Sequence, residues 1–198
     1  MSGRSRSAPP PASGRITIER LRTLLTSPKS LASDPEWRTE GDKAKLTIPI
    51  EIEGLTVEGR QLRSTALVRY PMREVTLGLV YLPGGDEGGM FERIDAWPFR
   101  RHVNKGHGPK ALRFRVFAEG ESQHQGLEIN AHLPVDQLLD NLPIAQPIEP
   151  PLGSWRDLMR HASKAWRFEP ELMLPSPPWQ PDLLSAQGTT GRAGGRRR

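Results

Sequence analysis

Hydrophobic and polar positions alternate along the first half of the chain, and this period of two is typical of β-strands. The clearest case begins at Lys43, where apolar positions alternate with polar residues and one proline: Leu46, Ile48, Ile50 and Ile52. Because Pro49 has no N–H to donate, the predicted strand is expected at an edge of its sheet. Further strands are predicted at residues 62–70, 74–82 and 91–97, and their short connections favour an antiparallel meander.

The second half of the chain mixes the periods of strands and helices. Residues 112–117 alternate again and predict a fifth strand, and the apolar positions at 127, 129 and 131 suggest a sixth. Apolar residues at helical spacing predict helices at 17–25, 135–142 and 154–167. We therefore expect one α+β domain, with a mostly antiparallel sheet of five or six strands and two or three helices packed on one face.

The last predicted helix has two distinct faces. One face is apolar and is expected to pack on the core; it holds Trp155, Leu158, Met159, Ala162 and Trp166. The opposite face is a basic stripe of Arg156, Arg160, Lys164 and Arg167. This stripe is either an ordinary solvated face or, with Arg160 and Lys164, a second cationic binding surface.

Composition separates a domain from two ends. The chain has 19 Gly and 20 Pro among its 198 residues, and many of them lie near the termini. Residues 1–14 are Pro-rich and basic, and residues 171–198 are Pro-rich and then basic, so both ends are predicted to be disordered around a domain at 15–170. Trp179 is unusual in such a tail. It either docks on the domain or binds a protein partner.

The net charge of +5 hides a local asymmetry. Without the seven arginines of the two ends, 21 basic residues face 23 acidic ones. Residues 93–115 alone carry seven cations against one acid, Asp95. Aromatic side chains that could stack on bases interleave with these cations, namely Phe99, Phe114 and Phe117. This segment therefore favours an anionic partner, most plausibly nucleic acid.

The candidate binding residues follow from this charge pattern. They are Arg93, Arg100, Arg101, Asn104, Lys105, Arg113, Arg115, Arg160 and Lys164. In the same segment, His102 and His107 could act as general base and general acid, so a metal-independent ribonuclease or toxin is an alternative function. A structural role is the other alternative for this loop, because Asn104 and Gly106 tolerate a positive φ.

Other kinds of site are not expected. The chain has no Cys, and the cations beside His102 and His107 would repel a metal dication, so we expect no metal and no cofactor. The Gly-rich residues 83–89 lack the Lys-Ser/Thr pair of a phosphate-binding P-loop. A third class of function is a protein–protein adaptor or structural component that uses the acidic remainder of the core and the tail around Trp179.

The central segment resembles small bacterial and phage α+β proteins of uncharacterised function, over about 30 residues. The resemblance lies in Arg93-Ile94-Asp95, His102-x-Asn104, Gly106 or Gly108, and the basic-aromatic strand that ends at Glu119-Gly120. These proteins share an R-[LI]-D strand, a P/H-x-N-x-x-G turn and an H-x-H strand, and some toxin–antitoxin components are similar in layout. Here the H-x-H positions read Arg113-Phe114-Arg115, and the turn glycine falls two or four residues after Asn104. The resemblance implies a protein of mobile-element or defence type, without a reaction.

The expected compartment is the cytoplasm. No apolar run reaches the roughly 20 residues that a membrane helix needs, and the N-terminal residues lack the apolar stretch of a signal peptide. The absence of Cys fits a reducing environment.

Overall fold

The structure is a computed structural model that describes residues 16–82 and 88–180, without the side chains of residues 55–58. The predicted disordered end at residues 1–14, residues 181–198 of the one predicted at 171–198, and most of the Gly-rich segment therefore lie outside the described residues. Within them, no helix is long and apolar enough to cross a membrane.

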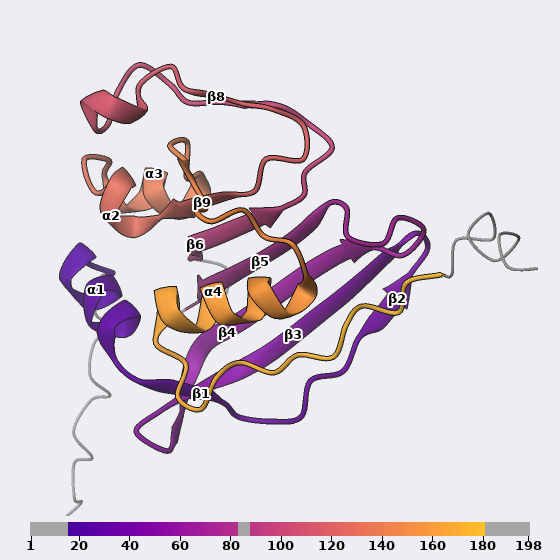
Figure 1. Cartoon of the computed structure of the whole chain (residues 1–198). Helices are drawn as coiled ribbons and strands as arrows, with labels where there is room; N and C mark the ends of the chain where they lie inside the picture. The colour runs from indigo at the N-terminus through magenta and orange to yellow at the C-terminus, as the bar shows by residue number, and fades with distance from the viewer. Residues whose placement is uncertain (1–15, 83–87, 181–198) are drawn as a thin grey trace, which may run out of the picture.

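The architecture is α+β, as predicted, and is built on one large antiparallel sheet (Figure 1). The sheet has eight strands rather than five or six. They are β1 (Lys29–Leu31), β2 (Arg38–Glu40), β3 (Lys43–Ile52), β4 (Leu55–Leu67), β5 (Val75–Tyr81), β6 (Gly89–Ala96), β9 (Gln123–Gly126) and β10 (Gln146–Pro147). The order across the sheet is β1-β3-β4-β5-β6-β9-β10, with β2 also paired to β3.

Strand β3 shows how the alternating pattern becomes a two-sided sheet. Ala44, Leu46, Ile48 and Ile50 are buried, and the intervening side chains from Lys43 to Pro49 are exposed. The outer edge of β3 is covered at its two ends, because β2 pairs with residues 43–45 and β1 with residues 50–52. Pro49 lies between these two partners, where its missing N–H costs no ladder hydrogen bond.

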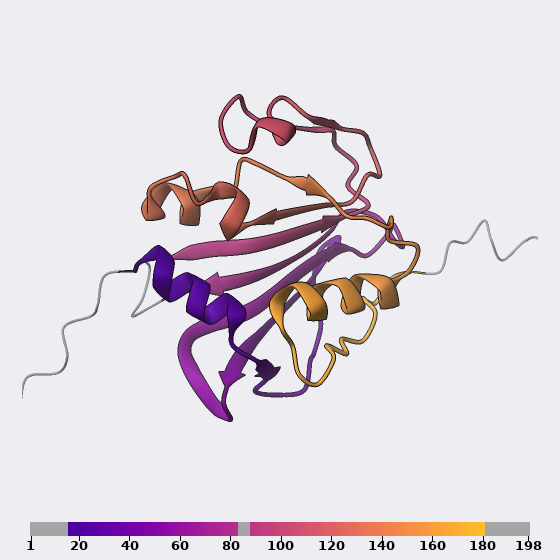
Figure 2. The same ribbon diagram turned by 60° about the vertical axis from the view of Figure 1, so that its left-hand side comes forward.

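Four α-helices contribute to a single hydrophobic core on one side of the sheet. Figure 2 shows α1 (Ile18–Thr26) and α4 (Trp155–Trp166) on that side. The other two are the short α2 (Leu127–Asn130) and α3 (Val135–Asp140). Helices α1 and α4 each begin with a side-chain cap: Thr17 Oγ1 accepts a hydrogen bond from Arg20 N, and Ser154 Oγ accepts one from Asp157 N.

The predicted faces of α4 are confirmed. Leu158, Met159, Ala162 and Trp166 are buried, and the four residues of the basic stripe are exposed. Trp155 is half-buried, and its indole Nε1 donates to the carbonyl of Leu174 at 2.9 Å.

Two predicted strands are wrong. The strand at 112–117 is instead a 3-10 turn, η1 (Lys110–Leu112), followed by a tight turn and the two-residue strand β8 (Val116–Phe117). Phe114 adopts a left-handed backbone with φ +56°, which interrupts the extended conformation of a regular strand. The strand predicted at 127–131 is helix α2, and strand β9 lies just before it, in a segment for which no strand was predicted.

The domain also continues beyond the predicted boundary at residue 170. Leu172 and Leu174 are buried in the core, and the chain runs back along the sheet beside α4 (Figure 1). The indole of Trp37 donates to the carbonyl of Pro175 at 2.9 Å. Trp179 packs edge-on against Trp155, with ring centroids 5.8 Å apart, so of its two expected roles it adopts docking on the domain.

Candidate functional site

The basic central segment forms a lobe, which we define as residues 98–120. The lobe projects from the β6 side of the sheet (Figure 1). Its two arms are held together by β7 (His102–Val103), which pairs with β8 in a separate two-stranded sheet. A hydrogen bond of 2.8 Å from Gly120 N to the carbonyl of Pro98 closes its base.

Asn104 fixes the lobe to the domain. Its Nδ2 donates to the carbonyls of Leu112 and Ala145, and its Oδ1 accepts from Ala145 N, each at 2.8 Å. The same Oδ1 lies 3.0 Å from His102 Nε2. Asn104 is only 1% exposed, and all its side-chain polar atoms have partners within the protein. The polar atoms of Asn104 are therefore occupied by bonds within the fold and are not available to a ligand.

Phe114 is the exposed aromatic residue of the lobe. Its side chain is 72% exposed, and its ring lies against the backbone of Gly106, because a Cβ at Gly106 would lie 2.4 Å from Phe114 Cζ. The other two aromatic candidates are not free to stack on a base. Phe117 is fully buried, and Phe99 packs edge-on against Tyr70 with centroids 5.2 Å apart.

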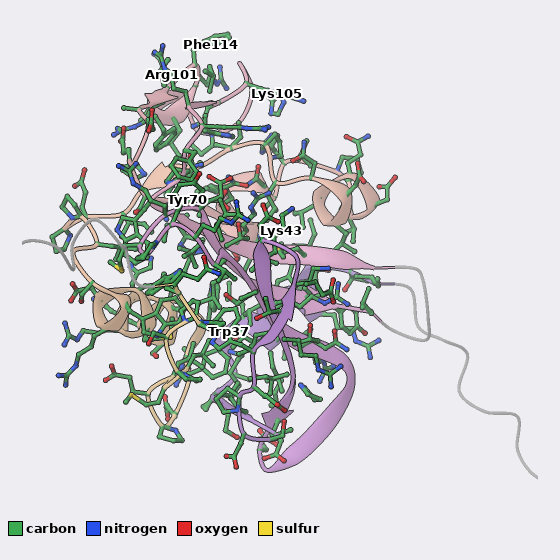
Figure 3. All side chains as sticks on the ribbon, turned by 90° about the vertical axis from the view of Figure 1, so that its right-hand side faces the viewer. Trp37, Lys43, Tyr70, Arg101, Lys105 and Phe114 are labelled. Atoms are coloured by element: carbon green, nitrogen blue, oxygen red, sulfur yellow. The ribbon has the colours of Figure 1, made fainter. Side chains whose placement is uncertain are left out.

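Three of the predicted cations are exposed on the lobe. Arg100, Arg101 and Lys105 are exposed and form no ion pair within the described part of the chain. Figure 3 shows Arg101, Lys105 and Phe114 together at one end of the molecule, away from Trp37 and Lys43. Arg113 is exposed as well, and its Nε donates to the carbonyl of Gly108 at 2.9 Å.

Two further predicted cations have structural partners. Arg115 forms an ion pair of 3.3 Å with Glu121, and its guanidinium lies 5.1 Å from the centroid of the Phe117 ring. Arg93 lies in β6 on the sheet face opposite the core, where its Nε donates to Asp95 at 2.9 Å. Arg93 is therefore outside the lobe.

The basic face of α4 is also separate from the lobe. Arg160 and Lys164 line a shallow hollow together with Glu169 and Glu171. Arg160 also forms an ion pair of 3.3 Å with Asp157. The acids reduce the positive charge of this surface, and both figures of the ribbon place α4 and the lobe apart.

The two candidate catalytic histidines have different partners. His102 lies 3.0 Å from the Asn104 amide oxygen, and its ring is tilted against Phe117. His107 Nδ1 is 2.9 Å from Nε2 of His132, which follows α2. This second pair borders a hollow of about 500 Å³ that Arg113 and Glu128 also line.

A buried polar cluster between β6 and α4 was missed from the sequence. Glu92 accepts hydrogen bonds from Leu127 N at 2.7 Å, His124 Nε2 at 2.7 Å and Trp166 Nε1 at 3.1 Å. The burial of Glu92 could have been predicted from the sequence, because Glu92 shares the inward face of its strand with Ile94. Its oxygens have three donors, which indicates a structural role.

Two basic groups near this cluster have altered pKa values. Burial, together with the charges of His124 and Lys164, lowers the pKa of His161 to about 4, and His161 Nε2 has no hydrogen-bond partner in the described structure. Burial also lowers the pKa of Lys29 to about 8. The Lys29 ammonium donates to the carbonyls of Leu25, Ser27 and Trp166, and so joins the C-terminal ends of α1 and α4.

The described residues contain no group of three His, Asp or Glu side chains that could hold a metal ion. No protein-family model, curated protein or solved structure matches the chain. The resemblance to small bacterial and phage proteins thus stays a prediction.

Proposed function

We propose that the chain binds single-stranded nucleic acid through the lobe. The observation that carries this proposal is the exposed ring of Phe114 among cations that have no acidic partner in the described structure. Proteins that bind single strands combine these two features, because an aromatic ring stacks on a base while cations contact the phosphates.

The backbone of Phe114 supports the same proposal. A left-handed conformation costs a residue with a side chain on the order of 1 kcal/mol, and packing of that side chain would normally compensate for the cost. Here most of the ring remains in contact with water. Backbone strain of this kind clusters at active sites and ligand-binding sites.

The lobe is also well anchored, which suits a binding surface. The buried amide of Asn104 holds both arms of the hairpin and Ala145. Because the lobe is already ordered, little conformational entropy has to be lost when a ligand binds.

The test compares two variants of the full chain. Phe114→Ala removes the proposed stacking platform, and Met173→Ala is a matched control, because Met173 is 73% exposed and lies beyond α4. Fluorescence anisotropy with a short labelled RNA or DNA strand reports the affinity. Loss of one base–aromatic stack should weaken binding roughly five- to hundredfold in Phe114→Ala. Equal affinity of the two variants would contradict the proposal.

A further inference from the structure

His107 and His132 form a hydrogen-bonded pair at the edge of the hollow. His107 Nδ1 lies 2.9 Å from His132 Nε2, so one of these two nitrogens donates and the other accepts. His132 also has a hydrogen bond with the backbone of Ile129. Two imidazoles held together in this way become a cationic group when they take up a proton.

Positive charge dominates around this pair. Burial, then the charges of His107 and Arg113, lower the pKa of His132. The acid that lines the hollow, Glu128, accepts two hydrogen bonds from the Arg22 guanidinium, at 2.8 and 3.1 Å, and its charge is balanced there. Arg113 donates from Nε to the Gly108 carbonyl, and its two terminal nitrogens form no hydrogen bond within the described part of the chain.

The loop between the two histidines brings the hollow close to Phe114. Gly108 has φ +84°, and a Cβ there would lie 3.4 Å from His132 Cε1, so this position favours glycine. Gly106 lines the hollow and also contacts the Phe114 ring. A base stacked on Phe114 would therefore have its own backbone beside Arg113 and the histidine pair.

We propose that this hollow binds a phosphodiester group of the strand whose base stacks on Phe114, with Arg113 and the protonated His107–His132 pair as its cationic partners. This inference rests on the proposed function. It gives the lobe a property that the exposed cations alone would not have, because binding should become tighter as the histidine pair takes up a proton.

The test measures oligonucleotide affinity of the full chain at pH 6 and pH 8 and constant ionic strength. The strand carries no terminal phosphate, so its charge stays constant across this range. Wild-type protein should bind about tenfold tighter at pH 6, the effect of one charged hydrogen bond. His107→Gln and His132→Gln should each lose this difference, and Arg113→Ala should bind about tenfold more weakly at both pH values.

His102→Gln is the matched control. It lies in the same lobe but outside the hollow and keeps a donor for the Asn104 oxygen, so its pH dependence should remain. A second measurement needs no variant: the ring resonances of His107 and His132 should shift on addition of the strand, and those of His161 should not. Unchanged His107 and His132 resonances, or a pH dependence that survives His107→Gln and His132→Gln, would overturn the inference.

The outcomes also separate this inference from the proposed function. If Phe114→Ala weakens binding and the histidine and Arg113 variants do not, the stacking proposal holds and the phosphate site is wrong. If the histidine variants lose the pH dependence and Phe114→Ala binds normally, the phosphate site holds and stacking is wrong.

Discussion

The side chain of Asn104 pairs with the backbone of Ala145 in both directions, donating to its carbonyl and accepting from its N–H, each at 2.8 Å. The side chain of Asn130 forms the same two hydrogen bonds with the backbone of Ile144, the residue before Ala145, at 2.9 and 3.0 Å. Two buried asparagines thus hold consecutive residues from two sides. They join the lobe, α2 and the segment before β10, and so position the proposed binding surface on the sheet.

Replacing Asn104 by Ala should therefore destabilise the domain. The change leaves the buried N–H and carbonyl of Ala145 without partners, and each such group costs about 1–3 kcal/mol. We expect the free energy of unfolding to fall by at least about 2 kcal/mol in urea denaturation. Asn141→Ala, at an exposed asparagine, is the control and should change it by less than about 0.5 kcal/mol. Equal stability of the two variants would show that Asn104 is not a clamp.

Truncation tests the revised domain boundary. A chain that ends at Pro170 loses the buried Leu172 and Leu174, and removal of each buried leucine side chain typically costs about 2–5 kcal/mol. A chain that ends at Gln180 keeps every contact that the structure describes. Thermal unfolding should therefore show a much lower Tm for the first chain than for the second. Similar Tm values for the two chains would mean that the domain ends at residue 170, as the sequence predicted.

Helix α4 should tolerate changes on one face only. Trp166 is fully buried and donates to Glu92, so Trp166→Ala should cost about 3–5 kcal/mol. Arg160→Ala and Lys164→Ala remove exposed side chains and should each cost less than about 1 kcal/mol in the same denaturation experiment. A larger loss of stability in Arg160→Ala or Lys164→Ala than in Trp166→Ala would mean that the basic face has a structural role.

His161 should make the fold sensitive to acid. Its pKa is lowered from 6.5 to about 4, so the unfolded chain binds a proton there at a higher pH than the folded protein does. The contribution of neutral His161 to the free energy of unfolding is therefore fully present above about pH 6.5, and it is lost as the pH drops towards 4. Because His161 is partly exposed, we expect a loss of only about 1 kcal/mol between pH 7 and pH 5. His161→Phe should lose less stability than wild type over this interval, and an equal loss would assign the effect to other groups.

The sequence predicted the elements whose burial follows a regular period. Strands β3 to β6 and helices α1 and α4 carry apolar residues on one face over at least seven positions. Strand β9 was missed because Gln123 and Gln125 are polar although both are buried. Residues 127–131 were misassigned because a short apolar run fits both a strand and a helix.

The site was predicted only as far as charge and exposure determine it. Arg100, Arg101, Lys105 and Phe114 could be proposed from composition, because loop cations usually remain exposed. The partner of His107 could not, since His132 lies 25 residues away and the turn at Phe114 decides how the segment folds back. Asn104 looked like a binding residue because sequence does not reveal that its amide is buried.

The salt dependence of binding tests the central claim most directly. The full-length triple variant Arg100→Ala, Arg101→Ala and Lys105→Ala is compared with Lys43→Ala, Arg69→Ala and Arg156→Ala, which removes equal charge from exposed positions outside the lobe. Both variants keep the basic ends of the chain and have the same net charge, so they differ only in whether the three cations are lost from the lobe or from elsewhere on the surface. On a single strand each phosphate contact contributes about −0.7 to the slope of log K against log salt concentration. The lobe variant should therefore flatten the slope by about two units, with little change in the control. Equal slopes in the two triple variants would contradict nucleic-acid binding by the lobe.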